Sequence, residues 1–192
     1  MFYELTLKSH VRVSPHLFAL NKEEAILKQL IDQFEDYVSK EIGIAIGVSA
    51  VENIGEGVIV PGDGSAYYDT TFKLYVFKPE MQEVIEGELT DITDFGTFIN
   101  LGPIDGMIHI SQTMDDYVTY SKTKVLTGKE TKQVLKVGDL CRARIVAVSY
   151  KNPKNPKINL TMRQPLLGNV KYVEEQIKTM KENSKKKEKK DG

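Results

Sequence analysis

The sequence has little cysteine, little histidine and no long apolar run. Among its 192 residues are one cysteine, Cys141, and three histidines. Neither a disulfide framework nor a zinc site of clustered thiolates can be built from these. No run of about 18 apolar residues occurs, and the start lacks the charged-then-apolar layout of a signal peptide. We therefore expect a soluble, cytoplasmic protein with no metal, no cofactor and no membrane partner.

Motifs for catalysis are also missing. The sequence has no phosphate-binding G-x-x-x-x-G-K-[ST] loop, and its three histidines do not complete a Ser–His–acid set. Asp91, Asp94 and Asp105 lie in an acidic stretch without His or Cys ligands, which favours solvated loop positions over a metal-dependent nuclease site. Cys141 fits a strand residue better than a nucleophile, because nothing near it in sequence would activate it. The sequence therefore favours a non-catalytic protein.

Basic residues are absent from the middle of the chain. Residues 82–121 contain 8 acidic and no basic side chains, whereas residues 122–163 contain 11 basic and 2 acidic ones. The overall net charge of −1 hides this division, so the second block can still form a basic face. Residues 1–81 carry 7 basic against 12 acidic side chains. This first part is a poor nucleic-acid binder, and its apolar surface favours a protein partner.

One amphipathic helix is predicted in the first half of the chain. Apolar residues recur at helical spacing after Asn21, at Leu27, Leu30, Ile31, Phe34 and Val38. Glu24 lies three residues after Asn21 and completes a capping-box pattern. The preceding segment, residues 2–13, has the alternation and the β-branched residues of a strand.

Strand-like segments follow this helix. They cover residues 43–52, 55–60 and 65–77, and the last two are joined by a turn tetrad, Pro61-Gly62-Asp63-Gly64. Residues 1–80 are therefore predicted to form an α+β module with one main helix on an antiparallel sheet. The segment 55–64 can form a protruding tip, because glycine lets a loop approach another backbone closely. The tip residues are Gly55, Gly57, Pro61, Gly62 and Gly64; a plain hairpin turn explains any single glycine about as well.

Residues 81–165 are predicted to form an all-β barrel. Five strand-like segments cover residues 84–92, 96–101, 105–110, 140–149 and 157–162. The third and fourth are joined by a polar connection, residues 112–136, too long for a tight turn. Five strands with one long connection fit a five-stranded OB-fold better than a sandwich, which has about seven strands. The remaining residues, 166–192, end in a Lys-rich stretch predicted to be a disordered tail, which either keeps the protein soluble or binds RNA weakly.

Aromatic and basic residues in this second half indicate single-strand binding. Phe95 and Phe98 flank Gly96-Thr97, and Gly96 permits a sharp strand entry or bulge that would let both rings project towards one surface. His109 lies in the next strand and can join them. Flat rings and basic residues together stack unpaired bases and neutralise phosphates; the basic residues are Arg142, Arg144, Lys157 and Arg163. Taken alone, such a Phe pair is more often part of a core than of a binding site, and a lone His is more often structural. The combination of rings, His109 and basic residues is what favours binding.

Three segments of this half resemble a known RNA-binding domain. They follow the ordered pattern of the ribosomal-protein S-one-type domain, a five-stranded OB-fold. The segments are EGELTDITDFGTFINLGPIDGMIHIS, VGDLCRARIVAVS and KINLTMR. The resemblance implies that Phe95, Phe98 and His109 contact RNA. Two positions depart from the pattern. Ser149 stands where many members have an acidic residue, and Lys157 follows an insertion, residues 152–156, where they have Arg.

The whole chain resembles a narrower family. Over residues 1–165 the chain is similar to the E-prime subunit of archaeal DNA-directed RNA polymerase and to its eukaryotic subunit-seven counterparts. The similarity is carried by the segment GEGVIVPGDGSAYYDTTFKLYVFKP, which runs directly into a barrel with an NLGPIDG loop. The resemblance implies that the first module docks its tip on the polymerase core subunits. It also implies a heterodimer with a small helical partner, the polymerase's F subunit, and a barrel that binds nascent single-stranded RNA.

Two other functions remain open from the sequence. The S-one-type barrel also occurs in translation and RNA-decay factors, although the first module resembles neither their partner domains nor a second barrel. The other is a scaffold whose barrel does not bind RNA. Exposed rings at Phe95, Phe98 and His109 would argue against a scaffold, and buried rings would favour it.

Overall fold

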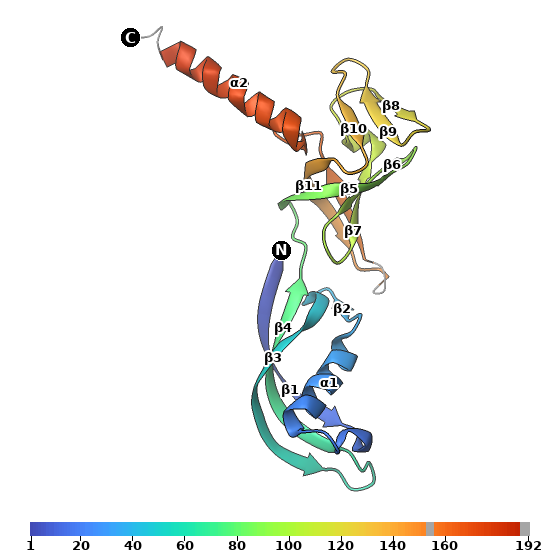
Figure 1. The fold of residues 1–192 in the computed structure, drawn as a ribbon, viewed down its shortest axis with the longest axis vertical. Helices are drawn as coiled ribbons and strands as arrows, with labels where there is room; N and C mark the ends of the chain where they lie inside the picture. The colour runs from blue at the N-terminus through green and yellow to red at the C-terminus, as the bar shows by residue number, and fades with distance from the viewer. Residues whose placement is uncertain (153–155, 189–192) are drawn as a thin grey trace. The chain divides into compact units, whose positions relative to one another are not determined.

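The chain folds into two compact units: residues 1–78, to which 150–152 also belong, and residues 79–149 with 156–188 (Figure 1). The computed structural model describes residues 1–152 and 156–188. Part of the insertion at 152–156 and the end of the predicted tail therefore lie outside the described residues. None of the described helices is long and apolar enough to cross a membrane.

The first unit is a four-stranded antiparallel sheet in the order β1–β4–β3–β2, with one helix packed on it. Its elements are β1 (Phe2–Val13), the 3-10 turn η1 (Pro15–Leu17), α1 (Lys22–Phe34), β2 (Val38–Ser39), β3 (Gly43–Ile59) and β4 (Ala66–Phe77). Ile26 and Leu30 of α1 share one buried apolar cluster with Val11 of β1 and with Phe72 and Leu74 of β4. This arrangement confirms the predicted α+β module with one main helix on an antiparallel sheet.

Helix α1 is shorter than its apolar pattern predicts. Glu35 has ψ of 128°, which ends the helix, and Asp36 has a positive φ of 55°, a region that Asp tolerates better than most residues. Val38 therefore begins β2, and Ile31 is left half-exposed. Among the described residues, the Asn21 side chain makes no capping hydrogen bond, so the predicted capping box does not form.

The predicted segments 43–52 and 55–60 form one strand, β3, rather than two. Strand β3 pairs with β4 along its length, with register shifts that absorb the extra residues. Gly55 and Gly57 consequently lie within β3 and not in the loop, which corrects the predicted tip. The turn itself contains Pro61, and Gly62 and Gly64 have φ of 93° and 70°, a region that favours glycine.

The second unit contains a closed five-stranded barrel, which confirms the predicted OB-fold. Its strands are β5 (Val84–Ile92), β6 (Gly96–Asn100), β7 (Asp105–His109), β11 (Leu140–Ser149) and β12 (Lys157–Thr161). They pair in the order β5–β6–β7–β12–β11, and β11 pairs back to β5 to close the barrel. Of these described strands, only β7 and β12 pair in parallel. Alternate side chains, including Leu89, Ile99, Ile108, Ile145 and Leu160, fill the interior.

The connection 112–136 folds into a sheet of its own, where the sequence predicted a polar connection. After the turn η2 (Ile110–Gln112), the strands β8 (Val118–Ser121), β9 (Val125–Gly128) and β10 (Val134–Lys136) form a three-stranded sheet in the order β10–β9–β8. Strands of three or four residues are too short to show a clear alternation.

A helix occupies most of the segment predicted to be a disordered tail. β13 (Gly168–Asn169) pairs with β11, and α2 (Val170–Glu188) follows it. Val173, near the start of α2, is buried. The lysines that suggested disorder are also good helix formers, so they allow the helix to continue from this buried start. Residues 189–192 lie outside the described residues.

Candidate nucleic-acid interface

Two phenylalanine rings lie together at the start of β6. Phe95 directly precedes the strand and Phe98 is its third residue. Their centroids are 6.0 Å apart at an interplanar angle of 85°, an edge-to-face contact. Phe95 is 48% exposed and Phe98 is partly exposed. Both rings therefore reach the surface. An RNA-binding face requires such exposure, whereas the scaffold alternative predicts buried rings.

Gly96 allows β6 to approach β7 closely at this point. It lies opposite His109 in the strand register, and a Cβ atom on it would come 2.3 Å from the backbone oxygen of Ile108. The predicted bulge is not at Gly96; the register shift lies in β5, between Leu89 and Asp91. Glycine is needed here because there is no room for a side chain.

His109 lies at the exposed end of β7, on the outward side of the barrel. Phe98 is opposite Met107, and His109 is two residues further along β7, so strand alternation puts all three side chains on one face. The Nδ1 atom of His109 accepts a hydrogen bond from the Ser111 backbone N–H at 3.3 Å and lies 2.8 Å from the Ser111 hydroxyl oxygen. These contacts fix the orientation of the imidazole ring.

Strand β12 continues this outward face. Asn159 is opposite Met107, and both are at least partly exposed. Lys157 is exposed and lies two residues before Asn159, on the same side of the strand. The structure therefore places Lys157 at the border of the face that carries Phe98 and His109.

Arg142 and Arg144 lie on β11. This strand pairs with β5 on one side and β12 on the other, so it is not a neighbour of β6 or β7, which carry the rings. Arg142 forms an ion pair with Glu86, with its Nη2 atom 2.6 Å and its Nε atom 2.8 Å from one carboxylate oxygen. The Nε atom of Arg144 is buried and has no hydrogen-bond partner within the described part of the chain. The structure does not bring these two arginines beside the rings.

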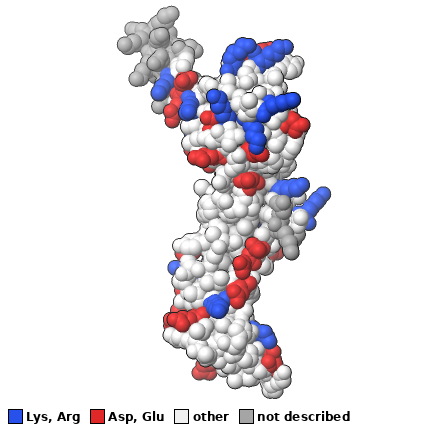
Figure 2. All heavy atoms as spheres, turned by 45° about the vertical axis from the view of Figure 1, so that its right-hand side comes forward, with Lys and Arg blue, Asp and Glu red and all other residues white. Residues whose placement is uncertain are grey.

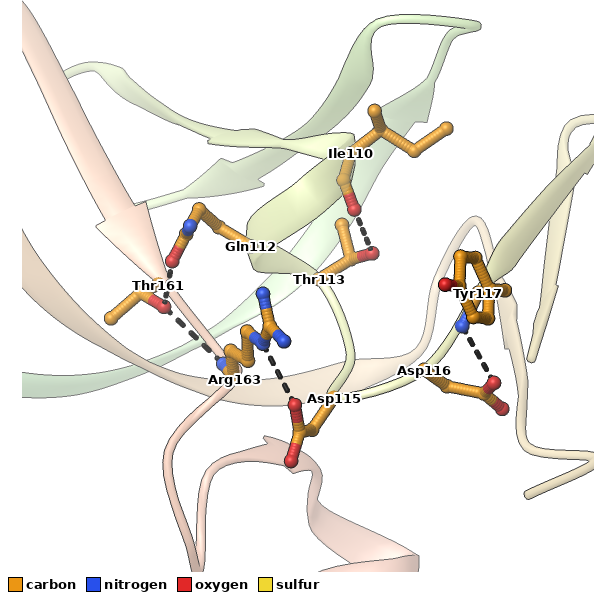
Figure 3. A network of polar contacts seen from close by, with 8 residues as sticks. All are labelled: Ile110, Gln112, Thr113, Asp115, Asp116, Tyr117, Thr161 and Arg163. Carbon is orange, nitrogen blue, oxygen red and sulfur yellow. Dashed lines mark hydrogen bonds and ion pairs between the residues drawn. The ribbon is translucent and has the colours of Figure 1, made fainter. Parts of the chain in front are cut away.

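Arg163 follows β12 and belongs to a small polar network (Figure 3). Its Nε atom donates to the Asp115 carboxylate at 2.8 Å, and its backbone N–H donates to the Thr161 hydroxyl at 3.3 Å. The Thr161 hydroxyl donates in turn to the side-chain oxygen of Gln112 at 2.8 Å. This network joins the end of β12 to the segment after η2.

Basic side chains gather over the β8–β10 part of the second unit (Figure 2). Within the described ranges, four lysines there have no ion pair: Lys122, Lys129, Lys132 and Lys136. The sequence predicts a basic block at these residues, but not the sheet that presents them.

The end of β3 and the turn that follows it present apolar side chains. Val58 and Ile59, the last two residues of β3, are 62% and 65% exposed, and Val60 at the start of the turn is 45% exposed. Arg12 of β1 fixes the turn with two hydrogen bonds to the Asp63 carboxylate, of 2.7 and 3.1 Å, and the Tyr67 hydroxyl donates to it at 2.6 Å. The hydrogen bonds from Arg12 and Tyr67 lower the pKa of Asp63 to about 2. A rigid turn with apolar sides is suited to insertion into a protein partner.

Cys141 and the acidic residues have the following surroundings in the described part of the chain. Cys141 is buried in the barrel, and burial raises the pKa of its thiol to about 12, so it stays protonated. Asp91 binds Lys124 at 2.7 Å, and this hydrogen bond lowers the pKa of Asp91. Residues 1–152 and 156–188 contain no group of three His, Cys, Asp or Glu side chains that could hold a metal ion.

These features define the class of the protein: an α+β module followed by an OB-fold barrel with an outward aromatic face. Residues 8–64 match the SHS2 domain found in the N terminus of Rpb7p/Rpc25p/MJ0397, and residues 78–153 match the S1 RNA binding domain. The chain belongs to the family of DNA-directed RNA polymerase subunit Rpo7, which confirms the resemblance seen in the sequence.

Relatives in this family match nearly the whole chain. Subunit Rpo7 of Sulfolobus acidocaldarius is 34% identical over 178 residues, which cover 92% of this chain and 97% of the relative. Rpo7 of Saccharolobus solfataricus is 36% identical over 175 residues, which cover 90% of this chain and 97% of the relative. The RNA polymerase III subunit RPC8 of Saccharomyces cerevisiae is 32% identical over 165 residues, which cover 82% of this chain and 77% of the relative. These matches favour a polymerase subunit over a translation or RNA-decay factor.

Proposed function

We propose that this chain is a non-catalytic subunit of DNA-directed RNA polymerase that binds nascent single-stranded RNA. It docks on the core subunits as a heterodimer with the small helical F subunit, and nucleotidyl transfer belongs to the large subunits. Membership of the Rpo7 family supports the polymerase assignment. The observation that carries the RNA-binding role is the outward face of Phe98 and His109 beside the exposed ring of Phe95.

The RNA-binding proposal follows from the chemistry of this face. Exposed rings offer π surfaces on which bases stack, and sequence-tolerant binding results because every base has such a surface. Lys157 and the free lysines of the β8–β10 sheet supply positive charge for the phosphates. Arg142 and Arg163 were predicted to contribute as well, but each is already paired with a carboxylate. Arg144 lies on the same outward side of β11 as Arg142, away from the rings.

The docking proposal assigns a different part of the molecule to the polymerase core. Val58, Ile59 and Val60 form an exposed apolar tip, and such side chains gain free energy when a partner covers them. The turn residues Pro61, Gly62 and Gly64 keep the tip narrow.

The polymerase assignment is tested by tagging the protein at its native locus and identifying the proteins that co-purify with it after nuclease treatment. We expect large RNA polymerase subunits and a small helical partner. Recovery of ribosomal or exoribonuclease components in their place would overturn the assignment and leave only the RNA-binding barrel.

The RNA-binding role is tested separately with the purified full chain and a labelled single-stranded RNA of about 16 nucleotides, the upper site size for one OB-fold. We expect Phe98→Ala to weaken binding by about fivefold or more, because one stacked base is lost. A matched control is Tyr75→Ala, which removes an exposed ring from β4 in the first unit. Equal affinities for the wild type and Phe98→Ala would favour the scaffold function.

A further inference from the structure

A pocket of about 470 Å³ lies between the barrel and the β8–β10 sheet. Its lining includes Ile110, Ser111, Asp115, Tyr117, Glu130 and Arg163. Its size falls within the range of small-ligand sites. Ile110 directly follows His109, and Ser111 is the residue that holds the His109 ring. The pocket therefore begins where the outward face of Phe98 and His109 ends.

The wall of this pocket is held in place by Asp116. Its carboxylate accepts hydrogen bonds from the Thr131 N–H and hydroxyl, both at 2.8 Å, and from the Glu130 N–H at 3.0 Å. It also accepts from the Tyr117 N–H at 2.6 Å (Figure 3). The Lys129 N–H donates to the Tyr117 backbone oxygen at 2.8 Å. These bonds tie the segment before β8 to the β9–β10 turn, so the pocket is formed before any ligand binds.

Tyr117 presents a largely free aromatic ring at this pocket. The residue is 77% exposed, more than any other large apolar or aromatic side chain in the described part of the chain. Its backbone is bonded on both sides, to Asp116 and to Lys129, while the ring stays in solvent. A ring held this way can stack on a base with little further loss of backbone freedom.

The charges around the pocket favour a base over a phosphate. Arg163 is already engaged by Asp115 at 2.8 Å, and Asp115 and Glu130 add carboxylates that repel a phosphate. A base carries N–H donors for a carboxylate and carbonyl acceptors for a guanidinium. Lys129 and Lys132 lie in the adjacent β9–β10 turn, where they can neutralise the flanking phosphates.

We propose that this pocket accepts one unstacked base of single-stranded RNA, with the Tyr117 ring as its stacking surface. The RNA site would then extend from Phe98 and His109 across η2 onto the β8–β10 sheet. This inference deepens the proposed function and rests on it, because it concerns the same RNA strand.

The test compares two ligands with the full-length chain: a single-stranded RNA of about 16 nucleotides, and an abasic ribose–phosphate oligomer of the same length. Tyr117→Ala is expected to weaken RNA binding by about fivefold or more and to leave abasic-oligomer binding unchanged. Tyr117→Phe keeps the ring and is expected to bind RNA like the wild type. The difference between the two ligands isolates the base contact, as a double-mutant cycle does.

The outcomes separate this inference from the proposed function. If Phe98→Ala weakens RNA binding but Tyr117→Ala does not, the pocket holds no base and the RNA-binding face stands. If Tyr117→Ala weakens both ligands equally, the residue acts through the fold or the phosphates, and the inference is wrong. If neither variant changes RNA affinity, or the wild type does not bind RNA, the proposed RNA-binding function fails together with the pocket. Circular dichroism and a melting curve confirm that each variant is folded.

Discussion

Gly96 controls the spacing of β6 and β7 under the candidate RNA face. A Cβ atom there would lie 2.3 Å from the Ile108 backbone oxygen, so any side chain forces the two strands apart. The same two strands carry Phe98 and His109. A change at this glycine should therefore disturb both the stability of the barrel and the geometry of the face.

Gly96→Ala is expected to lower the free energy of unfolding by about 1–3 kcal/mol, because the added methyl group overpacks the strand pair. The matched control is Gly47→Ala in β3, where a Cβ atom meets nothing within 4 Å. Denaturant unfolding of both variants measures the difference. Equal stability of Gly96→Ala and the wild type would show that the strands can separate without cost.

Asp116 makes the stability of the second unit depend on acid pH. Hydrogen bonds from Thr131, Glu130 and Tyr117 lower its pKa from 3.8 to about 2. A carboxyl group whose pKa is lowered on folding stabilises the protein above its unfolded pKa, and that contribution is lost as the pH falls through the folded value. We therefore expect Asp116→Asn to destabilise the protein at neutral pH.

The destabilisation by Asp116→Asn should shrink as the pH falls from 3.8 towards 2, where the wild-type carboxyl is also protonated. Melting temperatures across this range check the prediction. Asp105→Asn is the control, because Asp105 is exposed and its side chain has no hydrogen bond or ion pair among the described residues. A difference from the wild type that is the same at every pH would contradict this role for Asp116.

Single residues differ in how far the sequence reveals them. Phe95, Phe98 and His109 could be predicted as RNA contacts because an ordered motif surrounds them. The structure puts the Phe95 and Phe98 ring centroids 6.0 Å apart and His109 on the same face as Phe98. Tyr117, which we propose as a stacking surface, was not predicted from the sequence because it lies in a polar connection where no strand was predicted. Arg142 was predicted from its position in a basic block, but the pairing partner that engages it, Glu86, is far away in sequence and close only in the fold.

Among the elements, the β3–β4 hairpin is the one that we propose as the docking element, through its turn. Arg12 and Tyr67 hold Asp63, and the apolar residues beside the turn stay exposed. If the tip inserts into the polymerase core, a charge among its apolar residues should weaken assembly and leave the fold intact.

Ile59→Asp is expected to reduce the recovery of large polymerase subunits with the tagged protein by about tenfold or more, since a buried charge replaces an apolar anchor. Val137→Asp serves as the control. It adds the same charge at a 46% exposed position in the second unit. Unchanged recovery with Ile59→Asp, in a variant that melts like the wild type, would move the docking surface away from the tip.

The length of each strand determined whether it could be predicted from the sequence. Strands such as β1, β4 and β11 span 10 to 12 residues, and their alternation predicted them closely. The strands β8 to β10 have three or four residues each, and their order depends on distant contacts such as those of Asp116 with Thr131. The bulges of β3 hid its continuity, because each one shifts the alternation by a residue.

At the scale of the whole molecule, folding partly cancels the division of charge along the chain. Three basic residues of the block 122–163 pair with carboxylates of the block 82–121. The pairs are Lys124 with Asp91 at 2.7 Å, Arg142 with Glu86 at 2.6 Å and Arg163 with Asp115 at 2.8 Å. The sequence predicts the basic block, but only the fold shows which of its members remain available to phosphates.

The unpaired lysines of the β9–β10 turn, Lys129 and Lys132, should therefore carry part of the salt dependence of RNA binding. A single strand releases about 0.7 counterions for each phosphate that a protein neutralises. If each lysine contacts one phosphate, replacing both by Ala should make the slope of log affinity against log salt shallower by about 1.4. Lys28→Ala with Lys40→Ala removes the same charge from the first unit, from two exposed residues, and should leave the slope unchanged. Titrations of the full chain with single-stranded RNA at several salt concentrations measure both slopes. A slope that changes equally in the two double variants would mean that net charge, and not the β8–β10 sheet, attracts the RNA.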